Sequence, residues 1–247
     1  MEITAERFGT NSELYADTSL TEGVDYARRY RRHEWFDDDL AARIEVHRTT
    51  ILAPHGGGIE AGTSELCLAI AGYHPADLEP TPTDGPVHDY WMFEGLRSTG
   101  NAELHVTSTG CDDHVASSLT GGSLNAVGLH GCTTTQAELP DNTKAVLVGG
   151  RSTAFKSALL ERLIESEILA IDAAGVPELN GDEPTNIANR TLLGEGAQLE
   201  LTTPLRRAMF RINTREDRKN TTRRIFWTFT AAVRTAIADL ESIQPIP

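Results

Sequence analysis

His55 and Glu60 are the first residues in the chain whose types and spacing suit catalysis, because they flank the glycine-rich stretch "HGGGIE". Zinc binds imidazole and carboxylate groups, and a catalytic zinc keeps one position open for water. The glycines allow the backbone to turn back, so that both side chains can converge on one point. A phosphate-binding loop is the competing interpretation, but the lysine that should follow its second glycine is missing. Glu60 would also place a carboxylate beside the anion. We therefore expect both residues to be metal ligands.

A third ligand must come from further along the chain, where His105, His114 and His130 are available. We choose His130, because "GLHGC" ends a short apolar run and has glycines close to the histidine. His105 falls inside "ELHVT", which we interpret as a strand. A half-buried strand histidine is as good an explanation of it as any functional role. His114 begins a predicted helix. The remaining histidines are not near other candidate ligands in a recognisable motif and are expected to be structural: His33, His47, His74 and His88.

The composition describes an acidic protein of 247 residues with a net charge of −14 and a pI near 5.0. This charge argues against nonspecific nucleic-acid binding, which needs a large basic surface. No apolar stretch approaches the roughly 20 residues that cross a bilayer. The N-terminus also lacks the basic and apolar segments of a secretory signal. We expect a cytoplasmic protein without a membrane partner, which cell lysis could release. Its oligomeric state cannot be inferred.

Arginine supplies most of the positive charge and is concentrated in two blocks, one at residues 28–32 and one at 206–224. The simpler interpretation is that these arginines lie on solvated helix faces. The alternative is an anion-binding surface on an otherwise acidic protein.

Short apolar runs bounded by turn residues alternate with segments of helical spacing, which favours an α/β protein. We predict one domain over 1–247, a three-layer sandwich with a mixed, mostly parallel sheet, and a flexible segment at 1–24. The predicted strands are "RIEVHRTTILAP", ended by Pro54, and "DYWMFEGL", "AELHVTST", "NAVGLHGC", "KAVLVGG" and "AQLELTT". The predicted helices cover 63–72, 151–170, a short stretch from Pro204, and 221–243. The last has Ile225, Phe229, Val233, Ile237 and Leu240 on one face.

Five blocks along the chain together resemble the poly-γ-glutamate hydrolase family of phages and bacteria. They are "APHGGGIEAGTSEL", "LHVTST", "GLHGC", "LVGG" and "NIANR…GAQLEL", and the similarity extends from about Asp25 to the C-terminal helix. The resemblance implies a zinc carboxypeptidase-like α/β fold, one catalytic zinc, and hydrolysis of the γ-amide links of poly-γ-glutamate. It also implies that His55, Glu60 and His130 bind the zinc.

The same resemblance assigns Glu200 as the general base, which takes a proton from the zinc-activated water that acts as nucleophile. The sequence agrees, because a carboxylate between Leu199 and Leu201 on an apolar strand is out of place unless it is paired or functional.

An anionic substrate also needs positive groups, and guanidinium binds carboxylate in a bidentate manner. Arg190 lies in the polar loop before the Glu200 strand, and Arg206 and Arg207 follow that strand. We expect these three arginines to bind substrate carboxylates.

Two other functions stay open. The metal site could act as an amidase or carboxypeptidase on short peptides or acyl-amino acids, or the chain could be a non-catalytic relative that binds an anion.

Overall fold

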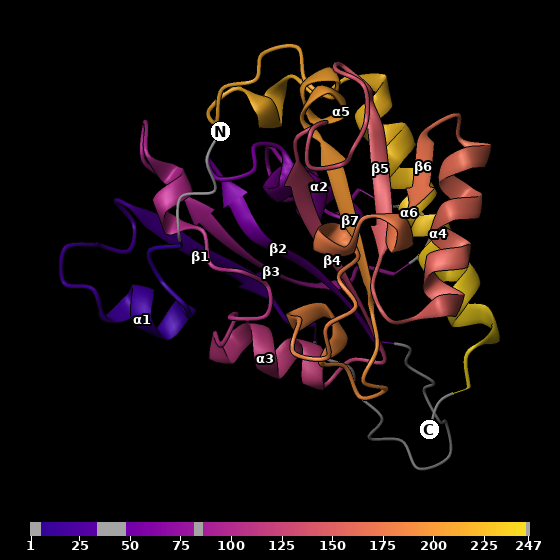
Figure 1. Cartoon of the computed structure of the whole chain (residues 1–247), viewed down its shortest axis with the longest axis horizontal. Coiled ribbons are helices and arrows are strands. Elements are labelled where there is room, and N and C mark those ends of the chain that lie inside the picture. Colours follow the sequence, from indigo (N-terminus) through magenta and orange to yellow (C-terminus); the bar gives the residue numbers. More distant parts are fainter. Residues whose placement is uncertain (1–5, 34–47, 82–85, 246–247) are drawn as a thin grey trace.

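One seven-stranded sheet organises the chain, and the computed structural model describes it through residues 6–33, 48–81 and 86–245. The strands are β1 (Tyr26–Arg31), β2 (Thr49–Gly57), β3 (Asp89–Gly95), β4 (Asn125–Cys132), β5 (Ala145–Gly149), β6 (Leu169–Asp172) and β7 (Ala197–Thr202). Their order is β1-β3-β2-β4-β7-β5-β6 (Figure 1). β1 is antiparallel to β3 and β5 is antiparallel to β7, whereas the other neighbours are parallel. The predicted mixed, mostly parallel sheet is therefore confirmed.

Helices cover both faces of this sheet and produce three layers. The α-helices are α1 (Asn11–Ala16), α2 (Thr63–Ala71), α3 (His114–Gly121), α4 (Thr153–Glu165), α5 (Thr203–Ala208) and α6 (Arg224–Ile243). The 3₁₀ turns are η1 (Asn101–Leu104), η2 (Ala173–Gly175), η3 (Pro177–Leu179), η4 (Ile187–Asn189) and η5 (Arg218–Asn220). One apolar cluster joins α2, α4 and α6 to one face, and a second joins α1, α3 and η4 to the other. No helix in the described ranges combines the length and the apolar character that crossing a membrane requires.

The C-terminal helix α6 follows its sequence pattern closely. Four of the five apolar positions on its predicted face are buried, and Ile225 is partly buried against the same core. This face lies on the side of the sheet where α4 also packs, and the two helices run next to each other in Figure 1. Burial of this stripe explains why the helix forms here.

The strand β2 continues beyond the point where we expected it to end. Pro54 does not stop it, because the strand extends to Gly57 with a register shift against β3 between Ala53 and Gly56. A proline lacks a backbone N–H, and an irregular ladder is where a strand can accommodate it. The earlier part of the predicted strand, residues 43–47, lies outside the described residues.

One strand prediction was wrong, and one helix prediction was wrong at its end. "AELHVTST" is not a strand, because η1 occupies 101–104 and irregular chain follows. Leu104 and Val106 are nevertheless both buried in the second apolar cluster, which explains the alternating pattern. The end of the predicted helix 151–170 is instead β6. The helix ends at Glu165, and Glu167 takes a positive φ of 60°, which breaks helical geometry.

The early arginine block forms the edge strand β1 and not the expected helix face. Arg28 pairs with Glu22 and Asp113, and Arg29 lies 3.4 Å from Glu94. A charged edge strand discourages pairing with another chain. The segment 1–24, which we expected to be flexible, is described from residue 6, and its Phe8, Leu14 and Leu20 are buried.

Candidate metal centre

The predicted site residues meet near the carboxyl ends of β2, β4 and β7. His55 lies in β2, His130 in β4 and Glu200 in β7. His130 is the direct neighbour of Glu200 in the ladder between β4 and β7, so the two side chains extend from the same face of the sheet. Ligands of open α/β sheets collect at this end of parallel strands.

The glycine loop after β2 brings Glu60 back to His55. The Glu60 N–H donates a 2.8 Å hydrogen bond to the His55 carbonyl and closes the turn. Gly57 has a φ of +65°, and a Cβ placed on it would lie 2.4 Å from the Gly95 carbonyl oxygen, so only glycine fits. The Glu60 carboxylate also accepts a 2.8 Å bond from the Gly131 N–H. The loop therefore brings the Glu60 carboxylate to His55, as predicted, and holds it against β4.

Donor atoms of His55, Glu60 and His130 lie within 3.9 Å of one another. His55 Nδ1 lies 3.2 Å from Glu60 Oε1 and 3.1 Å from His130 Nδ1. His130 Nδ1 lies 3.9 Å from Glu60 Oε2. Ligand atoms about 2.0–2.1 Å from a tetrahedral zinc are separated by roughly 3.3 Å. The spacing of these three groups fits one such ion.

Both imidazoles have a protein partner for Nε2, and their Nδ1 atoms face each other. His55 Nε2–H donates to the Val106 carbonyl at 2.7 Å, and His130 Nε2 is hydrogen-bonded to Ser108 Oγ at 3.1 Å. Such bonds to the second ring nitrogen orient histidine ligands in metal sites. The irregular segment 105–109, which we expected to be a strand, therefore supplies the hydrogen-bond partners of His55 and His130.

Electrostatics distinguishes the two buried imidazoles. Burial, together with the neighbouring His55, lowers the pKa of His130 to about 3, so this ring is neutral and has a free lone pair. Burial also opposes protonation of His55, but the Glu60 carboxylate outweighs it and raises the pKa of that ring. A metal ion binding there would displace this proton.

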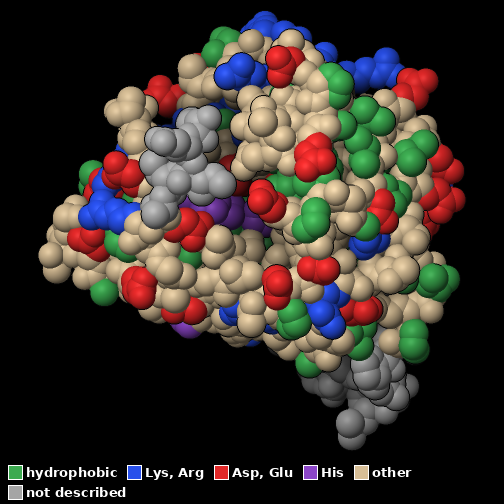
Figure 2. All heavy atoms as spheres, in the orientation of Figure 1, with side chains coloured by type: hydrophobic (Ala, Val, Ile, Leu, Met, Phe, Trp, Pro, Cys, Tyr) green, Lys and Arg blue, Asp and Glu red, His purple; other side chains and the backbone are tan. Residues whose placement is uncertain are grey.

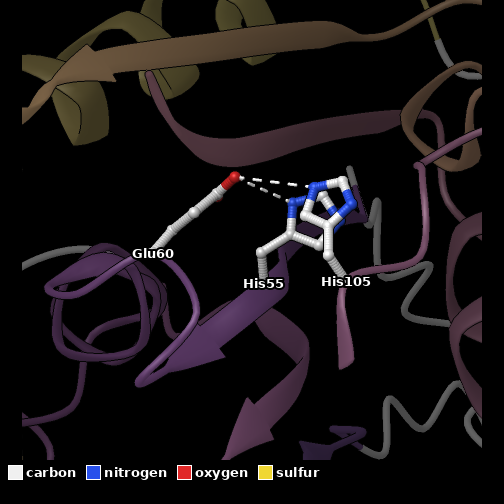
Figure 3. A group of neighbouring side chains, drawn as sticks. All are labelled: His55, Glu60 and His105. Atoms are coloured by element: carbon white, nitrogen blue, oxygen red, sulfur yellow. Dashed lines mark ion pairs between the residues drawn. The ribbon is translucent and has the colours of Figure 1, made fainter. Parts of the chain in front are cut away.

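His105 joins the cluster, which sequence reasoning did not predict. Its Nε2 lies 3.9 Å from Glu60 Oε1, and its ring stacks on His55 with 3.8 Å between ring centroids. His55, Glu60 and His105 offer ligand atoms that all lie within 4.8 Å of one another, and their side chains converge in Figure 3. The block "LHVTST" contained this residue, but interpreted as a strand it gave no sign that His105 would lie beside His55 and Glu60.

Glu200 is buried and anchored beside the cluster. Burial, and then the charge of Glu60, raise the pKa of Glu200 well above that of an ordinary carboxyl group. Its Oε1 accepts a 2.9 Å bond from the Gln198 amide, and Gln198 in turn accepts a 2.7 Å bond from Asn186. This chain of amides fixes the orientation of the carboxyl group.

A cavity of about 280 Å³ contains these groups. Figure 2 shows histidine side chains at the bottom of a hollow, with acidic side chains around it. Among the described residues that line the cavity there is no Lys or Arg, whereas four are glutamates: Glu60, Glu178, Glu183 and Glu200. The cavity is suited to a cation.

The three arginines expected to bind substrate do not line this cavity. Arg190 donates to the carbonyls of Cys111, Thr109 and Thr185. Arg206 is buried and donates to the Leu201 and Ala61 carbonyls at 3.1 and 3.0 Å. Their guanidinium groups hold backbone in place, and contact of these two residues with substrate stays a prediction. Arg207 is exposed on α5, and its contact with substrate stays a prediction.

Comparison with known proteins decides the family, since a model described as poly-gamma-glutamate hydrolase matches residues 31–232. The chain belongs to the poly-γ-glutamate hydrolase family. It is 34% identical over 190 residues to the SPbeta prophage-derived protein YoqZ of Bacillus subtilis strain 168, covering 75% of this chain and 60% of YoqZ. It is 31% identical over 180 residues to YndL of the same strain, covering 73% of this chain and 63% of YndL. The chain thus spans less than two thirds of both relatives.

Solved structures of the family share the fold. A bacteriophage poly-γ-glutamate hydrolase superposes with a TM-score of 0.78 at 27% identity, covering 97% of this chain and all of that one. A zinc-free form of YndL superposes with a TM-score of 0.77 at 26% identity, with the same coverage. The three-layer architecture matches the zinc carboxypeptidase-like fold expected from the sequence.

Proposed function

We propose that this chain is a zinc-dependent hydrolase of the γ-glutamyl amide bonds of poly-γ-glutamate, with one zinc held by His55, Glu60 and His130. The convergence of two Nδ1 atoms and one carboxylate, with both Nε2 atoms hydrogen-bonded to protein groups, carries the proposal. Two imidazoles and a carboxylate are a donor set found in catalytic zinc sites. Membership of the family supports the polymer as substrate.

Zinc bound there would supply an activated water and polarise the carbonyl of the scissile amide. The protein groups do the rest. Glu200, on the strand next to His130, accepts the proton of the attacking water and returns it to the leaving amine. The hydrogen bond from Gln198 holds the Glu200 carboxylate in position for both transfers.

The pKa of Glu200 is compatible with this role once a cation is present. Burial and the charge of Glu60 favour the protonated carboxyl group. A divalent cation next to both glutamates would oppose these effects and favour the ionised form, which is the form that acts as a base.

Metal analysis combined with a polymer assay tests the proposal. The purified protein is expected to contain about one zinc per chain, and His55→Ala and His130→Ala are expected to lose it. Poly-γ-glutamate should lose viscosity with the wild type but not after chelation, and zinc should restore the loss. Full zinc retention in both variants would refute the ligand assignment. Cleavage of short acyl-amino acids without depolymerisation would instead make the chain an amidase or carboxypeptidase for small substrates.

A further inference from the structure

The N-terminal segment before the family-matched region reaches the metal centre. The matched region begins at residue 31, yet Glu6 Oε1 lies 2.7 Å from His105 Nδ1. The Glu6 carboxylate can only accept, so the imidazole donates its Nδ1–H and leaves the Nε2 lone pair free. That Nε2 is the atom 3.9 Å from Glu60 Oε1.

The segment that carries Glu6 packs against the segment that carries His105. The Ser12 N–H donates to Asp112 at 2.8 Å, and the Tyr15 hydroxyl donates to Asp113 at 2.9 Å. A Cβ on Gly110 would lie 2.1 Å from the Gly9 carbonyl oxygen, so the two backbones are in direct contact. These contacts hold the N-terminal segment in place, so that Glu6 lies beside His105.

We propose that Glu6 is a positioning residue of the metal centre, which orients His105 so that its Nε2 becomes a further donor beside His55 and Glu60. The inference rests on the proposed function, since it assumes that the cluster holds zinc. Figure 3 shows His105 and His55 directed at the same side of Glu60. A carboxylate behind a ligand histidine fixes its ring and its tautomer, and loss of such a partner weakens metal binding by about 10- to 100-fold.

Glu6 is suited to mutation because it is only partly buried, with 31% of its side chain exposed. Glu6→Ala removes the acceptor, whereas Glu6→Gln keeps an acceptor oxygen and loses the charge. Glu103→Ala is the matched control: it removes one negative charge from η1, close to His105 in the sequence, where the side chain is 59% exposed and pairs with Arg7 and Arg97.

Zinc affinity, measured by competition with a chromophoric chelator, is the first measurement. We expect Glu6→Ala to bind zinc about 10- to 100-fold more weakly than the wild type, Glu6→Gln to lose less, and Glu103→Ala to match the wild type. The second measurement is the tautomer of His105, from long-range ¹H–¹⁵N correlations in the zinc-free protein. The wild type should show Nδ1–H, and Glu6→Ala should shift toward Nε2–H.

Wild-type zinc affinity in Glu6→Ala would overturn the proposal, whatever the tautomer. Equal losses in Glu6→Ala and Glu103→Ala would also overturn it, because they would show a general effect of charge. A wild-type protein that binds no zinc would refute the proposed function itself, so the two failures are distinguishable.

Discussion

The cavity and the buried arginines beside it differ in charge and in the groups that they contact. The cavity holds histidines and four glutamates, with no cationic side chain among its described lining residues. Arg206 and Arg218 lie outside the lining and are buried, and their donors are directed at protein groups. Arg206 binds the Ala61 carbonyl and Arg218 binds the Gly57 carbonyl, at opposite ends of the loop that carries Glu60.

The difference shows that an arginine-rich segment does not have to be the part that meets an anionic substrate. Here two of its members hold the ligand loop. Arg218 also forms a 2.9 Å ion pair with Glu65, which lies in the first turn of α2. The negative cavity is suited to a cation, and the positive groups hold the loop that brings Glu60 into the cavity.

The largest predicted effect is a loss of kcat on substitution of Glu200, the proposed general base. Glu200→Gln keeps the shape of the side chain but cannot accept the proton of the attacking water. We expect kcat to fall by about 10²–10⁴-fold while the zinc content stays near one per chain. Steady-state kinetics and metal analysis on the same preparation check this. Activity within a few-fold of the wild type would exclude Glu200 as the general base.

Breaking an arginine contact should instead cost stability. Arg218→Met leaves the buried Glu65 carboxylate without its partner, and Glu65 Oε2 already lacks a hydrogen bond within the described residues. Removal of one partner of a buried pair costs about 3–5 kcal/mol in unfolding free energy. Urea denaturation measures this loss.

The double variant Glu65→Leu/Arg218→Met is the matched control. Because it removes both charges, we expect it to recover much of the lost stability. If the single variant is as stable as the wild type but its KM for polymer rises strongly, Arg218 contacts substrate and the contrast drawn above is wrong.

Ionic strength should have the smallest effect and tests the sign of the charge in the cavity. Raising the ionic strength from about 0.01 to 0.15 M shortens the Debye length from roughly 30 to 8 Å. Screening weakens the repulsion between an acidic cavity and a polyanion, so KM for poly-γ-glutamate should fall by a few-fold. The control is the same polymer with its carboxylates esterified, which carries no charge. A KM that rises with salt would indicate that arginines guide the substrate after all.

The sequence predicted the parts of the site that depend on local pattern. His55, Glu60, His130 and Glu200 occupy strand ends or a glycine loop, and the structure brings all four together. His105 was missed because its segment alternates apolar and polar residues as a strand does. In the structure Leu104, at the end of η1, and Val106, in the irregular chain after it, are both buried without forming a strand. The partners of the arginines could not be predicted, because each lies on a distant segment. Arg218 and Glu65, for example, are 153 residues apart.

The most direct test of the account is a crystal structure of the zinc-loaded protein with anomalous data collected at the zinc edge. The account predicts one strong peak bonded to His55 Nδ1, His130 Nδ1 and the Glu60 carboxylate, with His105 Nε2 as the further donor and with Glu200 close to the peak but outside the ligand set. A peak bound through the Nε2 atoms of His55 and His130, or one outside this cavity, would contradict it.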